Sequence, residues 1–380
     1  MAGYLDGQRR RFDETRRLLV EHAAWLEPGD WVRVPVKRGV WHHTCATLPH
    51  AVVVDVVKEP KSAASGASPR RRVKTGILAG ARLVQGLRQP SRVEVPPVEP
   101  SRGNATIVIN ANDPRGDLTV LEPEAGRALR LAKPGSYDRE YVEVRHRFQR
   151  HLPAPGFSVS DDGAVLLEDF IDGQLLKGLP AERQVAVAVE VLHRYADLVA
   201  AERASDEGTV WEALPRLLDQ VRVPEVLWGL LADPRVWRLL TSGLLAPGKG
   251  DQAAGNILVQ DASMVFHVID FDQVAWLPVW WDPVGLVGRL PGHAGRLTGD
   301  QHRALASAAD RVWASAGLEG TKQLTPQHWA ALEALRMAWR KSARTNYPKA
   351  AGGLVEPDPN DFAGHLHQQA GKVEAQLARP

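Results

Sequence analysis

The chain has 380 residues, of which 44% are hydrophobic and 24% charged, and a formal net charge of +2. These values are average for folded proteins, so they exclude a disordered, fibrous or membrane-embedded chain and give no electrostatic reason to expect nucleic acid. Cys45 is the only cysteine, which excludes a disulfide-stapled secreted domain. No apolar leader or membrane-length apolar run occurs. We therefore predict a cytoplasmic protein with no nucleic-acid and no membrane partner.

The first hundred residues differ in composition from the rest of the chain. A helix is expected over 12–26, and two strands are expected at 31–36 and 51–57. Residues 59–103 are rich in Pro, Ser, Gly and Arg, a composition typical of loops and linkers. We therefore interpret residues 1–103 as an N-terminal extension that includes this linker-like part.

Between residues 104 and 172 the pattern becomes regular, and it predicts five strands and one helix in the order β-β-β-α-β-β. Ser136 is expected to cap the helix, because its hydroxyl can accept a backbone hydrogen bond. Asp138 and Glu140 suit the first turn, where the helix dipole favours negative charge. The strands are expected at 105–110, 118–122, 127–132, 157–160 and 164–170, and the helix at 136–151.

After Asp172 the sequence becomes mostly helical. Apolar residues between Val185 and Val199 recur at helical spacing. Further helices are predicted over 301–316 and from Thr325-Pro326 onward, where Thr caps the helix and Pro takes its first position. Residues 173–380 are therefore expected to form one larger helical region.

Two acidic motifs within this helical region carry the chemical signal. In the first, Gly250-Asp251 is followed by Asn256 and an apolar strand, and in the second, Asp270-Phe271-Asp272 ends another strand. The pair resembles the catalytic motif of the aminoglycoside phosphotransferase and choline kinase superfamily, which has His-Gly-Asp, four residues, Asn, a hairpin and Ile-Asp-Phe/Trp-Asp/Glu. Each fragment alone is ordinary turn chemistry, but the two together, correctly spaced, favour a kinase.

The resemblance implies an α+β, two-lobed protein-kinase-like fold. Residues 104–172 would form the small antiparallel β N-lobe with its one helix, and residues 173–380 the larger helical C-lobe. The extension 1–103 is atypical for the family. The cofactors implied are ATP, or GTP, and Mg²⁺, and the acceptor implied is a hydroxyl group of a small molecule or of a peptide.

The resemblance also assigns roles to the motif residues. Asn256, Asp270 and Asp272 would hold the metal ion, since Mg²⁺ prefers oxygen ligands. Asp251 would be the catalytic residue that accepts or orients the proton of the acceptor hydroxyl. Phosphoryl transfer depends mainly on positioning and on charge neutralisation, which these residue types supply.

A cation for the nucleotide phosphates is expected on the third strand of the N-lobe. Period-two alternation puts Arg130 on the face opposite Leu129 and Leu131, which favours it over Lys133. Glu140, or Glu143 one turn later, is expected to pair with this cation. Solvated charges are the competing interpretation for all of them.

The segment from Glu168 to Gly173 resembles the hinge between the lobes. There, backbone groups at Glu168 and Phe170 would meet the adenine edge, whereas the competing interpretation is a plain exit from a strand. Two departures stand out: Lys249 replaces the family's His, and no glycine-rich phosphate loop occurs.

These departures leave three hypotheses for the function. The first is a small-molecule kinase, the second a tailoring enzyme that phosphorylates Ser or Thr of a peptide, and the third a pseudokinase that binds partners. The Lys249 side chain either weakens the catalytic loop or reaches a phosphate. The acceptor and the oligomeric state cannot be read from the sequence.

Overall fold

The structure is a computed structural model, and it divides into two compact units. The sheet unit comprises Met1–Tyr137 and Gly156–Phe170, and the helical unit comprises Asp138–Pro155 and Ile171–Pro380. The residues that the structure describes are 21, 30–33, 40–43, 92–94, 105–109, 118–122, 125–205, 210–260, 265–271, 274–291, 297–319, 324–345 and 356–377.

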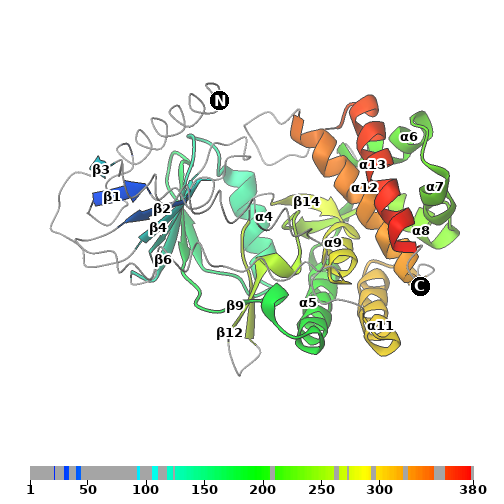
Figure 1. The fold of residues 1–380 in the computed structure, drawn as a ribbon, viewed down its shortest axis with the longest axis horizontal. Helices are drawn as coiled ribbons and strands as arrows, with labels where there is room; N and C mark the ends of the chain where they lie inside the picture. The colour runs from blue at the N-terminus through cyan, green and yellow to red at the C-terminus, as the bar shows by residue number, and fades with distance from the viewer. Residues whose placement is uncertain are drawn as a thin grey trace, which may run out of the picture. The chain divides into compact units, whose positions relative to one another are not determined.

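The sheet unit is built around one eight-stranded sheet with the order β3-β1-β2-β4-β5-β6-β8-β7 (Figure 1). All of its pairs are antiparallel. Three strands of the extension continue the sheet beyond β4, because Val40 pairs with Val108. The strands are β1 Asp30–Arg33, β2 Val40–His43, β3 Arg92–Glu94, β4 Ala105–Ile109, β5 Leu118–Glu122, β6 Arg127–Leu131, β7 Phe157–Val159 and β8 Val165–Asp169.

The extension is only partly described. Strand β1 overlaps the strand predicted at 31–36, whereas the strand predicted at 51–57 lies outside the described residues. Within the predicted linker 59–103, Arg92–Glu94 form β3, and the remainder lies outside the described residues. Of the helix predicted over 12–26, only the helical Glu21 is described.

The five strands and the helix predicted between residues 104 and 172 are all present, and they confirm the predicted α+β kinase-like fold. The helix is α4, Arg139–Gln149, but its cap differs from the prediction. Asp138 caps it, because one carboxylate oxygen accepts the N–H of Tyr141 at 2.9 Å. Ser136 lies two residues before Asp138, and its N–H donates to the carbonyl of Lys133.

The helical unit holds the longer helices and two small sheets. The sheets have the orders β10-β11-β14 and β13-β12-β9. Helices α5 and α11 lie side by side, as do α12 and α13 (Figure 1). The helices are α5 Ala181–Glu202, α6 Ala213–Gln220, α7 Glu225–Leu231, α8 Pro234–Leu240, α9 Trp281–Arg289, α11 Gly299–Ser315, α12 Pro326–Thr345 and α13 Pro359–Leu377. The strands are β9 Gln174–Leu175, β10 Ala204–Ser205, β11 Leu244–Gly248, β12 Ile257–Gln260, β13 Val265–Val268 and β14 Ala275–Pro278.

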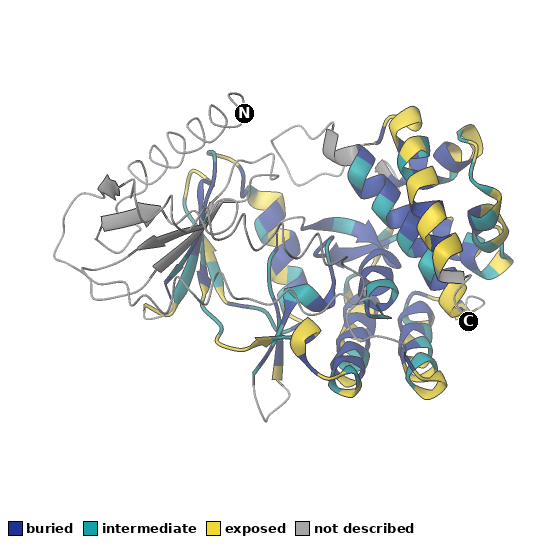
Figure 2. Ribbon diagram, in the orientation of Figure 1, coloured by how far each residue is buried: buried dark blue, intermediate teal, exposed yellow. Residues whose placement is uncertain are grey.

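Tryptophan side chains form much of the core of the helical unit. Trp281 and Trp339 are fully buried and both pack against the ring of Trp211. Strands β11 and β14 are mostly buried, while Figure 2 shows exposed residues along α13. No helix among the described residues has the length and hydrophobicity that crossing a membrane requires.

The two candidate caps of α4 can be separated by mutation. Asp138→Ala is expected to lower the free energy of unfolding by about 1 kcal/mol, because it removes the acceptor for a helix N–H. Ser136→Ala is the matched control, since the buried Ser136 hydroxyl has no hydrogen-bond partner among the described residues, and its effect should stay within about 0.5 kcal/mol. Urea unfolding of the full chain measures both. A larger loss for Ser136→Ala would contradict the assignment.

Candidate functional site

The hairpin of β12 and β13 brings Asn256 and Asp270 to the same end of a small sheet. Ile257 lies opposite Val268 in this hairpin, and the N–H of Ile269 donates to the carbonyl of Asn256 at 3.0 Å. Asn256 immediately precedes β12 and Asp270 follows β13, so the two residues lie at the same end of the hairpin. Residues that are 14 positions apart in the sequence are therefore neighbours in space.

Asp270 has an unusual backbone conformation. Its φ of +67° is the only positive φ of a non-glycine residue in the part of the chain that the structure describes. An L-residue in this region costs on the order of 1–2 kcal/mol, although Asp tolerates it better than most. Such strain is common where a side chain must be aimed at a ligand, so it supports a functional role for Asp270.

The amide of Asn256 is oriented by the loop that carries Asp251. Its Nδ2 donates to the backbone carbonyl of Asp251 at 2.7 Å. The other end of the amide, Oδ1, accepts no hydrogen bond from any described residue. An oriented amide oxygen beside a carboxylate fits the ligand preference of Mg²⁺. Asp272, the third predicted metal ligand, lies outside the described residues.

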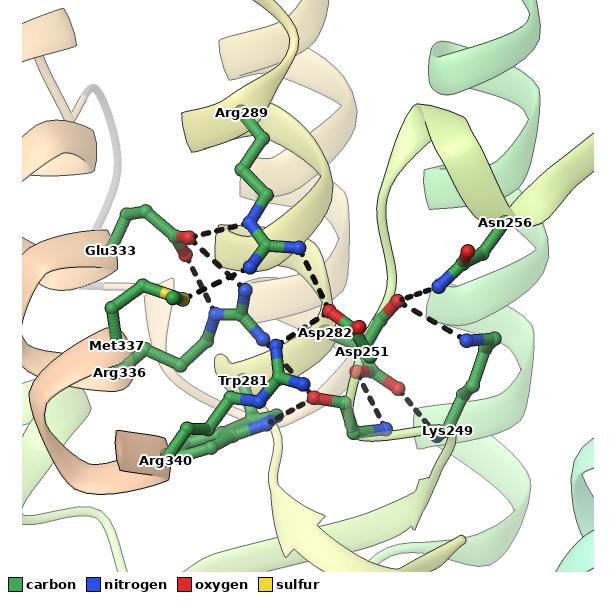
Figure 3. Close-up of polar contacts among 11 residues, drawn as sticks. Lys249, Asp251, Asn256, Trp281, Asp282, Arg289, Glu333, Arg336, Met337 and Arg340 are labelled. Carbon is green, nitrogen blue, oxygen red and sulfur yellow. Dashed lines mark hydrogen bonds and ion pairs between the residues drawn. The ribbon is translucent and has the colours of Figure 1, made fainter. Parts of the chain in front are cut away.

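The loop itself is held by Asp282 in the first turn of α9. Its two carboxylate oxygens accept the backbone N–H groups of Lys249 at 2.7 Å and of Gly250 at 3.1 Å (Figure 3). Asp282 is buried, and this burial raises the pKa of its carboxyl, although the two N–H groups and Lys249 oppose the shift. Helix α9 is therefore bonded directly to the loop.

Two further groups fix the peptide of Gly250. Its carbonyl accepts hydrogen bonds from the indole of Trp281 and from Arg336, both at 3.1 Å. The φ of Gly250 is +80°, which favours glycine at this turn. Close approach also requires glycine at position 285 of α9, because a Cβ there would lie 2.7 Å from the carbonyl of Gln252.

Lys249 occupies the position of the family's His and lies inside the loop. Its side chain is completely buried. Its ammonium group donates to the backbone carbonyl of Asp251 at 3.2 Å, the same oxygen that orients Asn256. Through this hydrogen bond, Lys249 braces the backbone of the loop that carries Asp251.

Asp251 is the centre of a cluster of ion pairs that the sequence analysis did not predict. Its Oδ1 accepts hydrogen bonds from Nη1 of Arg289 at 2.8 Å and from Nη1 of Arg340 at 2.5 Å (Figure 3). Burial alone would raise the pKa of Asp251, but attraction to Arg340, Lys249 and Arg289 outweighs it and holds the pKa far below its ordinary value. Asp251 is therefore ionised at any physiological pH.

Glu333 of α12 completes this cluster. Its carboxylate accepts Nε of Arg289 at 2.8 Å and both Nε and Nη2 of Arg336, at 2.7 and 3.1 Å. Glu333, Arg336 and Arg340 recur on α12 at intervals of three and four residues, which places them on one helix face. This spacing in the sequence could have indicated a charged face on the helix, but such a face usually points to water.

The nucleotide-binding residues predicted in the N-lobe lie mainly on the sheet unit. Arg130 of β6 pairs with Glu168 of β8, with 3.1 Å between Nε and Oε2, and both side chains are buried. The register confirms that Arg130 faces away from Leu129 and Leu131, because Arg130 and Glu168 share one sheet face. Lys133 follows β6 and is half-buried.

The predicted partner and hinge residues have other surroundings. Glu140 is exposed in the first turn of α4, and Glu143 pairs with Arg147 at 2.8 Å. Glu168 lies within the sheet, opposite Ala128 on one side and Phe157 on the other. The N–H of Phe170 donates to the carbonyl of Gly126 at 2.9 Å. The contact that the structure gives Glu168 is therefore the ion pair of its side chain with Arg130.

Comparisons with known proteins give structural neighbours only. No protein family model matches the chain, and no curated protein sequence does. Aminoglycoside phosphotransferase APH(3'')-Id from Streptomyces rimosus is 17% identical, with a TM-score of 0.36 over 58% of this chain and 90% of that chain. A choline/ethanolamine kinase family protein from Mesorhizobium loti is 15% identical, with a TM-score of 0.39 over 70% of this chain and 86% of that chain.

Plasmodium vivax ethanolamine kinase is a third similar structure, 10% identical, with a TM-score of 0.41 over 72% of this chain and 82% of that chain. These three proteins are of the kinds that the catalytic motif resembles. At such identities the likeness concerns the fold, and the chemistry rests on the residues of the site themselves.

The support that Asp282 gives to the loop can be measured. Asp282→Ala leaves two buried N–H groups without an acceptor and should lower the free energy of unfolding by about 2–5 kcal/mol. Asp282→Asn keeps one acceptor oxygen, so its loss should be smaller. Asp300→Ala, which removes an exposed carboxylate on α11, is the control and should cost less than about 0.5 kcal/mol. If chemical denaturation gave equal losses for Asp282→Ala and Asp300→Ala, Asp282 would not be the anchor.

Proposed function

We propose that this protein is an ATP- and Mg²⁺-dependent phosphotransferase that moves the γ-phosphate to a hydroxyl group of a small molecule. The observation that carries the proposal is the placement of three oxygen-bearing side chains around one loop and one hairpin end. Asn256 is hydrogen-bonded to the backbone of Asp251 and lies beside Asp270. This set is what metal-assisted phosphoryl transfer needs.

Asp270 and Oδ1 of Asn256 are the groups that would hold the metal ion, with Asp272 as a further ligand in the proposal. When bound, Mg²⁺ neutralises the charge on the phosphate oxygens. The strained backbone of Asp270 and the fixed amide of Asn256 preorganise two ligands before any metal arrives. A preorganised site spends less binding free energy on ordering its side chains.

Asp251 would orient the acceptor hydroxyl. A carboxylate with so low a pKa is a weak base, but the transition state of phosphoryl transfer is loose and demands little proton abstraction. Asp251 Oδ1 is already bonded to two guanidinium groups, so Oδ2 is the oxygen left to accept the hydroxyl hydrogen bond. The chain's main contributions are therefore position and charge.

Arg130 is the proposed cation for the nucleotide phosphates, ahead of Lys133. Its bond to Glu168 fixes the guanidinium on the sheet face, in the way that a helix glutamate was expected to do. Glu140 and the backbone near Phe170 remain candidates for the nucleotide in this proposal, as does GTP in place of ATP. A cytoplasmic location, where nucleotide is plentiful, is part of the same proposal.

Turnover of ATP by the purified full chain tests the proposal. We expect Mg²⁺-dependent release of ADP that falls by about two orders of magnitude or more in Asp270→Ala, because the metal loses a charged ligand. Asn256→Ala should lower it as well. Asp197→Ala removes an exposed carboxylate from α5 of the same unit and should leave turnover unchanged.

Two results would contradict the proposed function. One is wild-type protein that binds Mg²⁺ and nucleotide, by calorimetry, without any turnover across a broad acceptor library, which would indicate a pseudokinase. The other is turnover that survives in Asp270→Ala at the wild-type rate, which would move the chemistry to another part of the chain.

A further inference from the structure

The cluster around Asp251 has an uneven distribution of contacts. Oδ1 of Asp251 takes both Arg289 and Arg340, whereas Oδ2 has no hydrogen-bond partner among the described residues. In Figure 3 the two arginines approach Asp251 from one side, while Lys249 and Asn256 lie on the other. An acceptor hydroxyl that meets Oδ2 is therefore next to two guanidinium groups.

The charges of this cluster do not balance. Among the described residues, three arginines form ion pairs with only two carboxylates, so one positive charge is in excess. The arginines are Arg289, Arg336 and Arg340, and the carboxylates are Asp251 and Glu333. A buried or half-buried excess charge is costly unless an opposite charge joins it.

Arg340 shows the same shortage of acceptors. Its side chain is only 4% exposed, and its buried Nε has no hydrogen-bond partner in the part of the chain that the structure describes. Among the described residues, its side chain donates a hydrogen bond only to Asp251. Arg289 and Asp251 are 25% and 29% exposed, so they form the accessible edge of the cluster. The arginines thus have more hydrogen-bond donors than this part of the chain has acceptors.

We propose that the acceptor of this phosphotransferase carries an oxyanion, a carboxylate or a phosphate, near the hydroxyl that is phosphorylated, and that Arg289 and Arg340 bind it. The inference rests on the proposed function and adds the substrate class to it. Arginine is well suited to this task because its planar fork of N–H donors matches both kinds of oxyanion. An acceptor with an ammonium group in this position would be repelled by the same arginines.

The transfer step is the ordinary one. The acceptor oxygen forms a bond to the γ-phosphorus. The bond between that phosphorus and the oxygen that bridges the β- and γ-phosphates breaks, and ADP leaves with the electron pair. The hydroxyl proton passes to Asp251 Oδ2 or to water. Arg289 and Arg340 take no part in bond making, and they position the acceptor through its oxyanion.

An anion titration tests the inference without knowledge of the natural acceptor. The full chain is held at constant ionic strength with Mg²⁺ and a non-hydrolysable ATP analogue, and its melting temperature is followed against inorganic phosphate, malonate or ethanolamine. We expect phosphate, malonate or both to raise the melting temperature and ethanolamine to leave it unchanged. Comparison of the phosphate and malonate arms tells which oxyanion the site prefers.

Variants locate the binding. Arg289→Gln should weaken the apparent affinity for the anion by about tenfold or more, because one charge-assisted contact is lost. Arg289→Lys, which keeps the charge, should lose less. Arg194→Gln removes an exposed arginine from α5 and is the matched control, with wild-type affinity expected. Arg340→Gln is the second test of the site, and its folding is checked by circular dichroism.

Turnover with four related sugars gives an independent answer. Glucosamine, glucose, glucuronate and glucose 6-phosphate share a ring and differ in charge, and we expect an anionic member to be preferred. The inference is overturned if neither anion changes the melting temperature of the wild type, if Arg289→Gln binds the anion as the wild type does, or if glucosamine is the preferred sugar. When no sugar is phosphorylated, the anion titration decides.

Failure of the proposed function is a separate outcome. Binding of the ATP analogue is measured on its own by calorimetry, and the anion titration is repeated without nucleotide. Loss of nucleotide binding with intact anion binding would remove the kinase and keep the oxyanion site. Intact nucleotide binding and turnover without any anion effect would keep the kinase and remove the oxyanion site.

Discussion

The carboxylate of Asp282 is the constraint on which the rest of the site depends. It accepts two consecutive N–H groups from a loop that contains a left-handed glycine, and it does so from the first turn of a buried helix. This fixes the loop backbone between β11 and β12. The carbonyl of Asp251, placed by that backbone, then receives both Lys249 and Asn256. One buried acid thus determines where an amide and a second acid lie.

The second consequence is electrostatic. Because the loop is fixed against α9 and α12, Asp251 lies within reach of arginines from both helices. Their attraction keeps the carboxylate ionised, and their number exceeds what it can neutralise. The same contacts that make Asp251 a poor base make its surroundings attractive to an anion. Position and charge, rather than basicity, are what this arrangement supplies to a reaction.

Much of this was predictable from local sequence, and part of it was not. Strands β4 to β8 follow from short runs of strand-forming residues between turn residues, whereas the meeting of Asn256 and Asp270 on the β12–β13 hairpin was implied by the resemblance of the motif. The cap of α4 was missed because Ser136 and Asp138 compete over two residues. Arg289 and Arg340 were missed because helical periodicity cannot tell a polar face turned to a site from one turned to water. The Arg130–Glu168 pair required knowledge of which strands are neighbours.

The most direct test of the central claim is the electron paramagnetic resonance spectrum of Mn²⁺, used in place of Mg²⁺, with a non-hydrolysable ATP analogue and the full chain. If Asn256 and Asp270 share a metal ion, a protein-bound signal should require both nucleotide and chain, persist in Asp197→Ala and vanish in the double variant Asn256→Ala/Asp270→Ala. A Mn²⁺–nucleotide signal that the chain does not alter, or a bound signal that the double variant retains, would contradict the account.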